Sequence, residues 1–263
     1  MVSIYGRKLY LITTIDDYSR LLLYADLFER ETTWAHIQAV KSVVLQYGCP
    51  MKYYADQHRI FRFVKNRDKQ SPWRNYSKFT DDVNPQWKQV LLDCNSEPVY
   101  ALSPQAKGKV ERPYGWLQDR IVRTAAKENI TTMTELRQVL KDLVQQYNTK
   151  WVHSTTKEIP IVRFEKALND QRCLFKPLKL AQPNQHIDDI FCLRAQRVVD
   201  SYRKISLDGV VLSVPKGIPR ATIDLHMVPD LKNNLVSIRF WQGAVFLGSQ
   251  NASLKEFKTI VQF

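Results

Sequence analysis

The chain has 263 residues, 44% of them hydrophobic, which is enough to bury a core and predicts two domains. Its 39 Lys and Arg against 26 Asp and Glu give a formal net charge of +13, which indicates an anionic partner such as nucleic acid. No apolar run approaches the ~20 residues that span a bilayer, and the four scattered cysteines form no C-x-x-C pair. We therefore expect a cytoplasmic protein with reduced thiols, no zinc finger and no membrane partner.

The first half of the sequence alternates between strand and helix patterns. Two β-rich runs over residues 9–15 and 21–28 predict a hairpin, with acidic and Ser residues in the turn 16–20. The expected elements that follow are a helix, a strand, an inserted basic loop, a short helix and a strand, over residues 31–47, 51–55, 57–83, 84–94 and 97–102. This alternation predicts an α/β domain.

A carboxylate lies among cations in the run 103–112. Ser103 suits the cap of a helix, and four-residue spacing places Lys107 and Glu111 on one face of it. Gly108 lies between them, where a bare backbone lets a bulky partner come close. Taken alone, this pattern is more typical of a solvated helix face.

A second acid, Asp56, ends the apolar strand over 51–55. Both Asp56 and Glu111 lie in basic surroundings, with seven cations against two acids over 56–78 and six against three over 101–130. Carboxylate oxygens are the ligands that hard divalent cations prefer. The pair is therefore a candidate metal site within a phosphate-binding region.

The second half begins with a helix over 132–147, where Thr132 and Glu135 form a capping-box pattern. The character changes after residue 175, and we expect a linker over 171–190 and a small all-β barrel over 191–263. Its strands are expected over 197–199, 204–207, 210–214, 222–227, 235–240 and 245–248. The cations over 191–220, Arg194 among them, favour contact with a DNA backbone.

Several motifs in this order resemble the integrase catalytic core of the ribonuclease-H-like superfamily, as found in transposases of bacterial insertion sequences. The matching segments are the sequence IDDYSR at 15–20, GCP at 48–50, YAD at 54–56, SPQAKGKVER at 103–112, and Tyr147-Asn148 followed by His153 and Pro160. The resemblance covers about residues 7–165 and implies a core over 1–170, with a mixed sheet flanked by helices and a basic insert at 57–83.

The resemblance also implies chemistry. Such transposases hold two Mg²⁺ (or Mn²⁺) ions with an Asp-Asp-Glu triad and use them in phosphoryl transfer. Asp56 matches the second acid and Glu111 the third, and both are expected to be catalytic and to bind metal. They are 55 positions apart, more than the family usually shows, and the insert accounts for the excess.

The same resemblance implies a DNA-binding role for the residues around these acids. Lys107, Lys109 and Arg112 are expected to neutralise phosphate, Gly108 to permit close approach of DNA, and Arg59 and Arg62 in the insert to contact DNA. His153 is expected to fix the loop after the last core helix.

The first acid of the triad has no match. Residues 1–7 contain no acid, and we expect the family's first strand to be missing from an N-terminally truncated chain. Asp16 and Asp17 are the available substitutes, but they match a turn that the family does not use for metal. Both interpretations of these two acids remain open.

Two functions follow from this pattern. The first is DNA transposition or integration: an integrase-type transposase that cleaves and joins DNA as a homo-oligomer on element ends and target DNA, near the nucleoid of a bacterial cytoplasm. The alternative is a catalytically inactive remnant that only binds DNA or interferes with transposase assembly.

Overall fold

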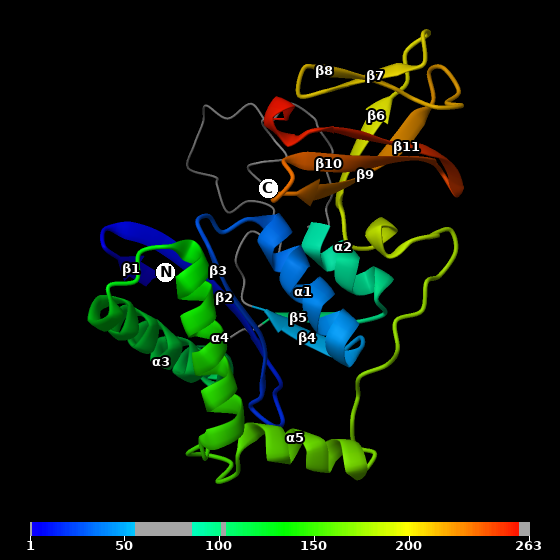
Figure 1. The fold of residues 1–263 in the computed structure, drawn as a ribbon. Helices are drawn as coiled ribbons and strands as arrows, with labels where there is room; N and C mark the ends of the chain where they lie inside the picture. The colour runs from blue at the N-terminus through cyan, green and yellow to red at the C-terminus, as the bar shows by residue number, and fades with distance from the viewer. Residues whose placement is uncertain (1, 56–85, 101–103, 258–263) are drawn as a thin grey trace. The chain divides into compact units, whose positions relative to one another are not determined.

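The computed structural model describes residues 2–55, 86–100 and 104–257. The chain forms two compact units (Figure 1). Of the described residues, the first unit contains 2–31, 38–55, 96–100 and 104–178, and the second contains 32–37, 86–95 and 179–257. None of the helices in these ranges is both long and apolar enough to cross a membrane.

The first unit begins with an antiparallel sheet of three strands: β1 (Val2–Ile4), β2 (Arg7–Ile15) and β3 (Leu22–Phe28). The predicted hairpin is confirmed as β2 and β3, which pair from Tyr10 and Phe28 onward. A short strand that was not expected, β1, precedes the hairpin and pairs with β2; it contains no acid, so the absence of the family's acid-bearing first strand stays a prediction. A two-residue turn at Tyr5 and Gly6, with φ of 47° and 77°, makes this short strand possible.

A parallel pair of strands follows helix α1 (Thr33–Tyr47): β4 (Lys52–Ala55) and β5 (Glu97–Tyr100). The pair is joined to the first sheet, since the hydroxyls of Thr14 on β2 and Tyr53 on β4 share a hydrogen bond of 2.6 Å. The two strands are in register, with Ala55 opposite Tyr100 at their carboxyl ends. The unit thus contains an antiparallel sheet and a parallel pair of strands, and helices alternate with strands along the chain. This confirms the predicted α/β class.

The first unit contains three further helices: α3 (Pro104–Glu128), α4 (Met133–Lys150) and α5 (Pro160–Asn169). The capping box at Thr132 and Glu135 is confirmed at the start of α4. α3 continues through Pro113 without restarting. Beyond the proline, fully buried Leu117 and Ile121 pack in the core against the β1–β3 sheet and α4 (Figure 1), which stabilises the helix across the lost backbone bond.

Gly48 is required where α1 ends. Its φ is +98°, and a Cβ at this position would lie 2.7 Å from the carbonyl oxygen of Lys176. This close approach lets Cys49 and Lys176 form a β-bridge, with N···O distances of 2.7 and 2.9 Å. The bridge fixes the chain beyond α5 next to the entry into β4.

The second unit is rich in β-structure, as predicted. All six expected strands are present, as β6 (Leu193–Val198), β7 (Lys204–Leu207), β8 (Val210–Ser213), β9 (Thr222–Asp230), β10 (Leu235–Gln242) and β11 (Val245–Ser253). Four of them form an antiparallel sheet in the order β11-β10-β9-β6, and β7 pairs with β8. The unit also contains α2 (Gln86–Asp93) and the 3-10 helices η1 (Ile187–Asp189) and η2 (Leu254–Glu256).

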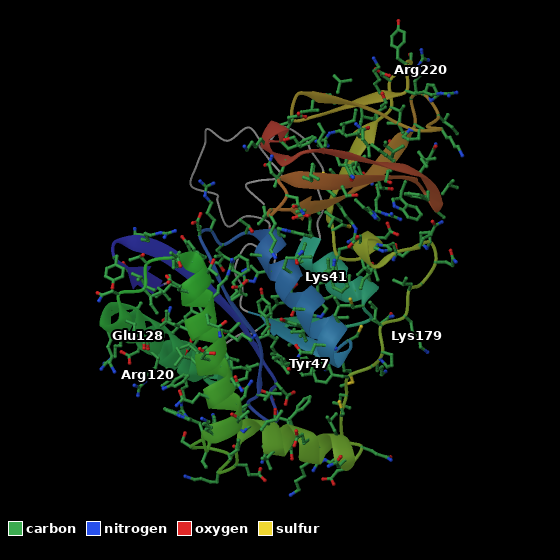
Figure 2. All side chains as sticks on the ribbon, viewed as in Figure 1. Lys41, Tyr47, Arg120, Glu128, Lys179 and Arg220 are labelled. Atoms are coloured by element: carbon green, nitrogen blue, oxygen red, sulfur yellow. The ribbon has the colours of Figure 1, made fainter. Side chains whose placement is uncertain are left out.

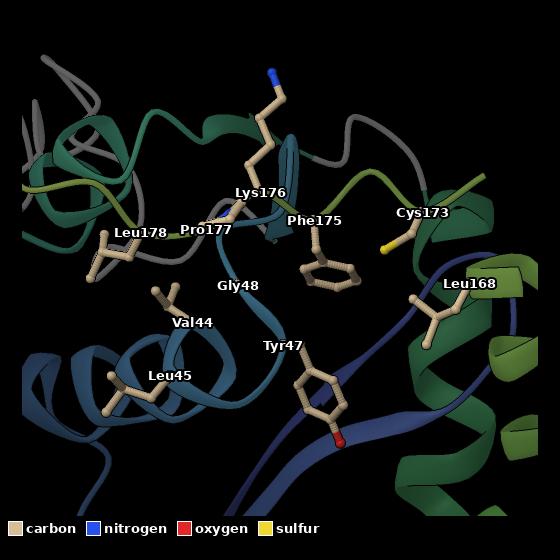
Figure 3. Close-up of a pocket in the computed structure, with 10 residues that line it drawn as sticks. All are labelled: Val44, Leu45, Tyr47, Gly48, Leu168, Cys173, Phe175, Lys176, Pro177 and Leu178. Carbon is tan, nitrogen blue, oxygen red and sulfur yellow. The ribbon is translucent and has the colours of Figure 1, made fainter. Parts of the chain in front are cut away.

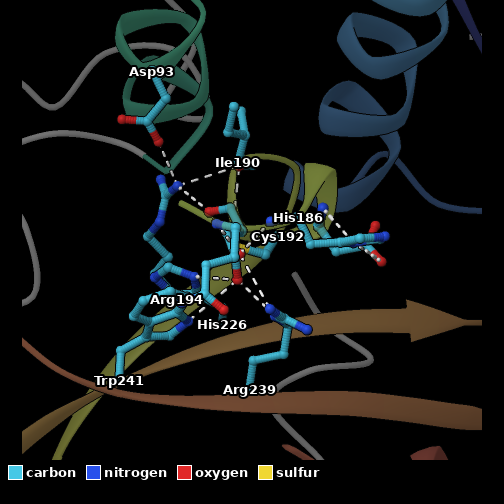
Figure 4. A network of polar contacts seen from close by, with 11 residues as sticks. Asp93, His186, Ile190, Cys192, Arg194, His226, Arg239 and Trp241 are labelled. Carbon is cyan, nitrogen blue, oxygen red and sulfur yellow. Dashed lines mark hydrogen bonds and ion pairs between the residues drawn. The ribbon is translucent and has the colours of Figure 1, made fainter. Parts of the chain in front are cut away.

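A buried acid holds the second unit together (Figure 4). The carboxylate of Asp189, fully buried, accepts hydrogen bonds from Arg239 Nε at 2.6 Å, from Trp241 Nε1 at 3.2 Å, and from the backbone N–H groups of Gln185 and His186. Burial alone would raise the pKa of Asp189, but the hydrogen bonds from Arg239 and the two backbone groups outweigh it and hold that pKa below its usual value.

Arg194 connects this centre to α2. Its Nη2 lies 2.5 Å from a carboxylate oxygen of Asp93 and 3.0 Å from the carbonyl oxygen of Asp189. Arg194 was expected to contribute to a DNA-contacting surface, but its charge is used within the protein. The physical reason is its neighbour Asp93, which is 101 positions away in sequence.

Candidate functional site

The parallel pair β4–β5 brings together the chain that leads to Asp56 and the chain that leads to α3, which carries Glu111. Asp56 follows Ala55 directly in the sequence, and α3 begins four residues after Tyr100, which lies opposite Ala55. Glu111 lies on α3 about two turns after Pro104 and is exposed. Asp56, Arg59 and Arg62 themselves lie outside the described residues.

The sequence of α3 carries three cations close to Glu111, at positions 107, 109 and 112. Arg112 is exposed beside it. The backbone of Lys107, Gly108 and Lys109 is part of α3, and their side chains lie outside the described part of the structure. Glu111 and Arg112 are therefore the predicted site residues of α3 whose side chains the structure describes.

Asp16 and Asp17 lie in the turn between β2 and β3. The Oδ2 atom of Asp16 accepts hydrogen bonds from the N–H of Ser19 at 2.7 Å and from its Oγ at 2.6 Å. The carboxylate of Asp17 pairs with Arg20 at 3.2 Å, and Arg20 also donates to the backbone carbonyl of Asp17. These contacts account for both acids as residues that close a turn.

The turn is held against the end of α4 and against α5. The amide of Asn148 accepts from the N–H of Leu22 at 2.9 Å and donates to its carbonyl at 3.0 Å. The guanidinium of Arg163 donates to the carbonyl of Tyr18 at 3.0 Å and lies 4.1 Å from the centre of the Tyr18 ring. Two motifs of the sequence, 15–20 and 147–148, are thus brought together, a contact that neither motif predicts.

His153 fixes its own loop, as expected. Its Nδ1 accepts from the N–H groups of Thr155 and Thr156 at 3.2 and 3.4 Å, and its backbone N–H donates to the carbonyl of Glu158 at 3.0 Å. Burial lowers the pKa of His153, and the positive charges of Arg20 and Arg112 lower it further. These effects favour the neutral ring, and they show that Arg20 and Arg112, from two other segments, lie within electrostatic range of His153.

Aromatic side chains pack against one another between α3 and the end of α4. The ring of Trp116 lies 4.7 Å from that of Trp151 and 5.8 Å from that of Tyr147, measured between centroids. Trp116 packs against the core while remaining partly accessible. Trp151, at the end of α4, is 38% exposed and was not singled out from the sequence.

A separate apolar pocket lies in the first unit, between the end of α1 and the segment after α5 (Figure 3). Its volume is about 560 Å³, and none of its lining residues is an acid. Cys173 reaches this pocket and is half-buried, whereas the other three cysteines are buried. The pocket therefore does not belong to the surroundings of Glu111.

The chemistry that the cations and donors of this region support is the binding of an anion. Arg112, Arg20 and His153 supply positive charge and N–H donors, and Glu111 supplies oxygen ligands. Within the described ranges, no three His, Cys, Asp or Glu side chains are arranged to hold a metal ion. Asp56 is not in those ranges.

The amino-acid sequence is similar to those of known proteins. No known family model matches the chain. It is 27% identical over 225 residues to a protein of Sinorhizobium fredii named as the transposase y4bF, a match that covers 84% of this chain and 44% of that relative. It is 26% identical over 155 residues to the transposase for insertion sequence IS1202 of Streptococcus pneumoniae, covering 59% of this chain and 31% of the relative. The chain spans less than half the length of either relative.

Solved integrase structures show a weaker likeness. The intasome of simian T-cell lymphotropic virus, bound to a PP2A regulatory subunit, gives a TM-score of 0.45 at 12% identity, covering 94% of this chain and 75% of that one. The catalytic core of the HTLV-2 integrase, solved with magnesium, gives 0.42 at 12% identity, covering 61% and 87%. Scores of this size do not establish a common fold, and the assignment rests on sequence: the chain is a relative of bacterial transposases, among them one encoded by an insertion sequence.

Proposed function

We propose that the chain forms the catalytic part of a DNA transposase, with a ribonuclease-H-like integrase core that cleaves DNA strands and joins them to target DNA. The parallel register of β4 and β5 carries the proposal. It puts the strand that leads to Asp56 and the strand that leads to the Glu111 helix at one edge of a sheet, as a pair of carboxylates acting together requires.

Asp56 and Glu111 would hold divalent metal, Mg²⁺ or Mn²⁺, with two ions in a complete site. The exposed carboxylate of Glu111 fits this role, because carboxylate oxygens suit hard cations. When bound, such ions supply Lewis-acid stabilisation of the attacking and leaving oxygens at phosphorus. The protein's own part is to position a phosphodiester beside these acids.

DNA is the proposed partner, bound by a homo-oligomer of the protein. Arg112, Lys107 and Lys109 neutralise phosphates near the cut, Gly108 allows the backbone to approach α3, and the insert contributes Arg59 and Arg62. This role is supported by the net charge of +13 and by the relatives, which are named as transposases.

The proposed organisation has a core over 1–170, a linker over 171–190 and a barrel-like DNA-binding domain over 191–263. In the second unit, exposed Arg203, Lys216 and Arg220 would contact the DNA backbone (Arg220 is labelled in Figure 2). Arg194 is excluded from this set by its ion pair with Asp93.

The test is a nicking and joining assay on plasmid DNA with Mg²⁺ or Mn²⁺, comparing the parent chain with Glu111→Gln. The control is Glu128→Gln, an exposed acid at the other end of the same helix (Figure 2). We expect metal-dependent cleavage that Glu111→Gln abolishes and Glu128→Gln retains. Cleavage that survives Glu111→Gln contradicts the assignment, and DNA binding without any cleavage favours the inactive remnant.

A further inference from the structure

Two buried donors of the first unit lack acceptors among the residues that the structure describes. The hydroxyl of Tyr147 and the indole N–H of Trp116 are buried, and neither has a hydrogen-bond partner among the described residues. Tyr147 is only 5% exposed. Because a buried polar group without a partner is costly, such groups in a native protein call for a ligand, an ion or water.

The two donors belong to a single cluster between α3 and α4. Their rings lie 5.8 Å apart, and the half-exposed ring of Trp151 lies 4.7 Å from Trp116 at the surface. Arg112 is four residues before Trp116 on α3, so both side chains project from neighbouring positions on one face of the helix. Trp151 and Arg112 are therefore the exposed members of this cluster, and a ligand reaches its two buried donors when these side chains move aside.

The charges around this cluster are positive. The positive charge of Arg20 interacts electrostatically with both Tyr147 and His153, and that of Arg112 with His153. Asn148 holds the turn that carries Arg20 in this position through its two hydrogen bonds to Leu22. Since Nδ1 of His153 already accepts hydrogen bonds, the neutral ring keeps its proton on Nε2 and is a further donor.

We propose that Arg20, Arg112, Trp116, Tyr147 and His153, here called the donor cluster, bind a phosphate group. Guanidinium groups match phosphate oxygens in geometry and charge, and the neutral donors supply the remaining hydrogen bonds. The source of the phosphate, a DNA backbone, rests on the proposed function. A free phosphate ion has the same chemistry.

The first arm of the test measures binding of the full chain to duplex DNA over a range of salt concentrations. Arg112→Gln should weaken binding about tenfold and lower the salt slope by about 0.9, because one phosphate contact is lost. Tyr147→Phe should weaken binding about fivefold with an unchanged slope, because a neutral donor is lost. The controls are Arg120→Gln, exposed on the same helix, and Tyr5→Phe, whose hydroxyl bonds to Ala125 elsewhere in the unit, and both should bind as the parent does.

The second arm titrates the parent chain with inorganic phosphate and follows the indole N–H resonance of Trp116 by NMR, assigned with Trp116→Phe. A shift of this resonance that Tyr147→Phe weakens supports the site even if the chain binds no DNA, an outcome that would refute the proposed function alone. No shift, together with a DNA affinity that both cluster variants leave unchanged, overturns the inference and leaves the proposed function standing.

Thermal unfolding separates binding from folding. With an unpartnered hydroxyl, Tyr147→Phe should be at least as stable as the parent in the absence of ligand. A less stable Tyr147→Phe with unchanged DNA affinity means that the hydroxyl has a partner in the free protein, and this also overturns the inference.

Discussion

Two tryptophans show how differently the two units use polar groups. The indole N–H of Trp241 in the second unit donates to buried Asp189, which also binds Arg239 and two backbone groups. The indole N–H of Trp116 in the first unit is buried without an acceptor among the described residues. A polar centre whose hydrogen bonds are satisfied stabilises a fold, whereas a cluster of donors lacking acceptors is suited to a ligand.

The largest effect is expected from Asp189→Asn. The substitution leaves Arg239 without its charged partner in a buried centre and should cost about 3–5 kcal/mol of the free energy of unfolding. Urea denaturation measures this loss. The control is Asp224→Asn, whose carboxylate accepts from Gln196 at the surface and should change stability by less than about 1 kcal/mol. Equal losses of stability in the two variants would mean that the buried network contributes no more to the free energy of unfolding than a surface hydrogen bond does.

The second prediction concerns pH. Burial, and then the charge of Arg194, lower the pKa of His226 from 6.5 to about 4. The folded state therefore keeps this ring neutral while the unfolded chain takes up a proton, so stability should fall as pH drops from 6.5 to about 4, by about 3 kcal/mol in all. Urea unfolding at several pH values measures the loss.

His226→Gln should flatten most of this dependence. The pKa of His153 is also lowered, so a smaller slope in the same direction should remain and should disappear in a variant that also carries His153→Asn. A pH dependence that survives both substitutions would assign it to other groups.

A smaller loss is expected from Asn148→Ala, which removes both side-chain hydrogen bonds to Leu22. We expect about 2 kcal/mol of destabilisation, since two buried backbone groups lose their partners. DNA affinity should fall as well, because Arg20 is no longer held in place within the donor cluster. The matched control for both measurements is Thr149→Ala. Thr149 follows Asn148 directly, and this substitution removes a surface hydrogen bond to the carbonyl of Gln145.

The smallest effect comes from the tryptophans themselves. Trp116→Phe and Trp241→Phe remove similar apolar volume, but only the second removes a hydrogen bond made in the folded protein. Trp241→Phe should therefore be the more destabilising by about 1 kcal/mol in urea unfolding. The opposite order would show that Trp116 has an acceptor after all.

Local patterns predicted most of the elements, because hydrophobic periodicity and capping residues act within a few positions. The hairpin, α4 with its capping box and all six strands of the second unit are confirmed. The strand β1 was missed because three residues carry too little periodicity. The continuity of α3 through Pro113 was missed because packing, which the sequence does not show, offsets the lost hydrogen bond.

The candidate site was predictable only in its parts. The motifs around Arg20, Arg112 and Tyr147 were each visible, but their convergence depends on contacts such as that of Asn148 with Leu22, 126 positions apart. No sequence pattern pointed to Trp151, because its role depends on its contact with the ring of Trp116 in the folded protein. The roles of Asp56, Glu111 and the cations of the insert remain predictions.

The half-buried thiol of Cys173 has a practical consequence. Cys49, Cys94 and Cys192 are buried, and burial raises the pKa of the Cys192 thiol to about 12, which makes it a poor nucleophile. A maleimide dye should therefore attach at one place on the native protein, at the rim of the apolar pocket. The unmodified chain thus carries its own attachment point for a fluorescent label, with no engineered cysteine needed.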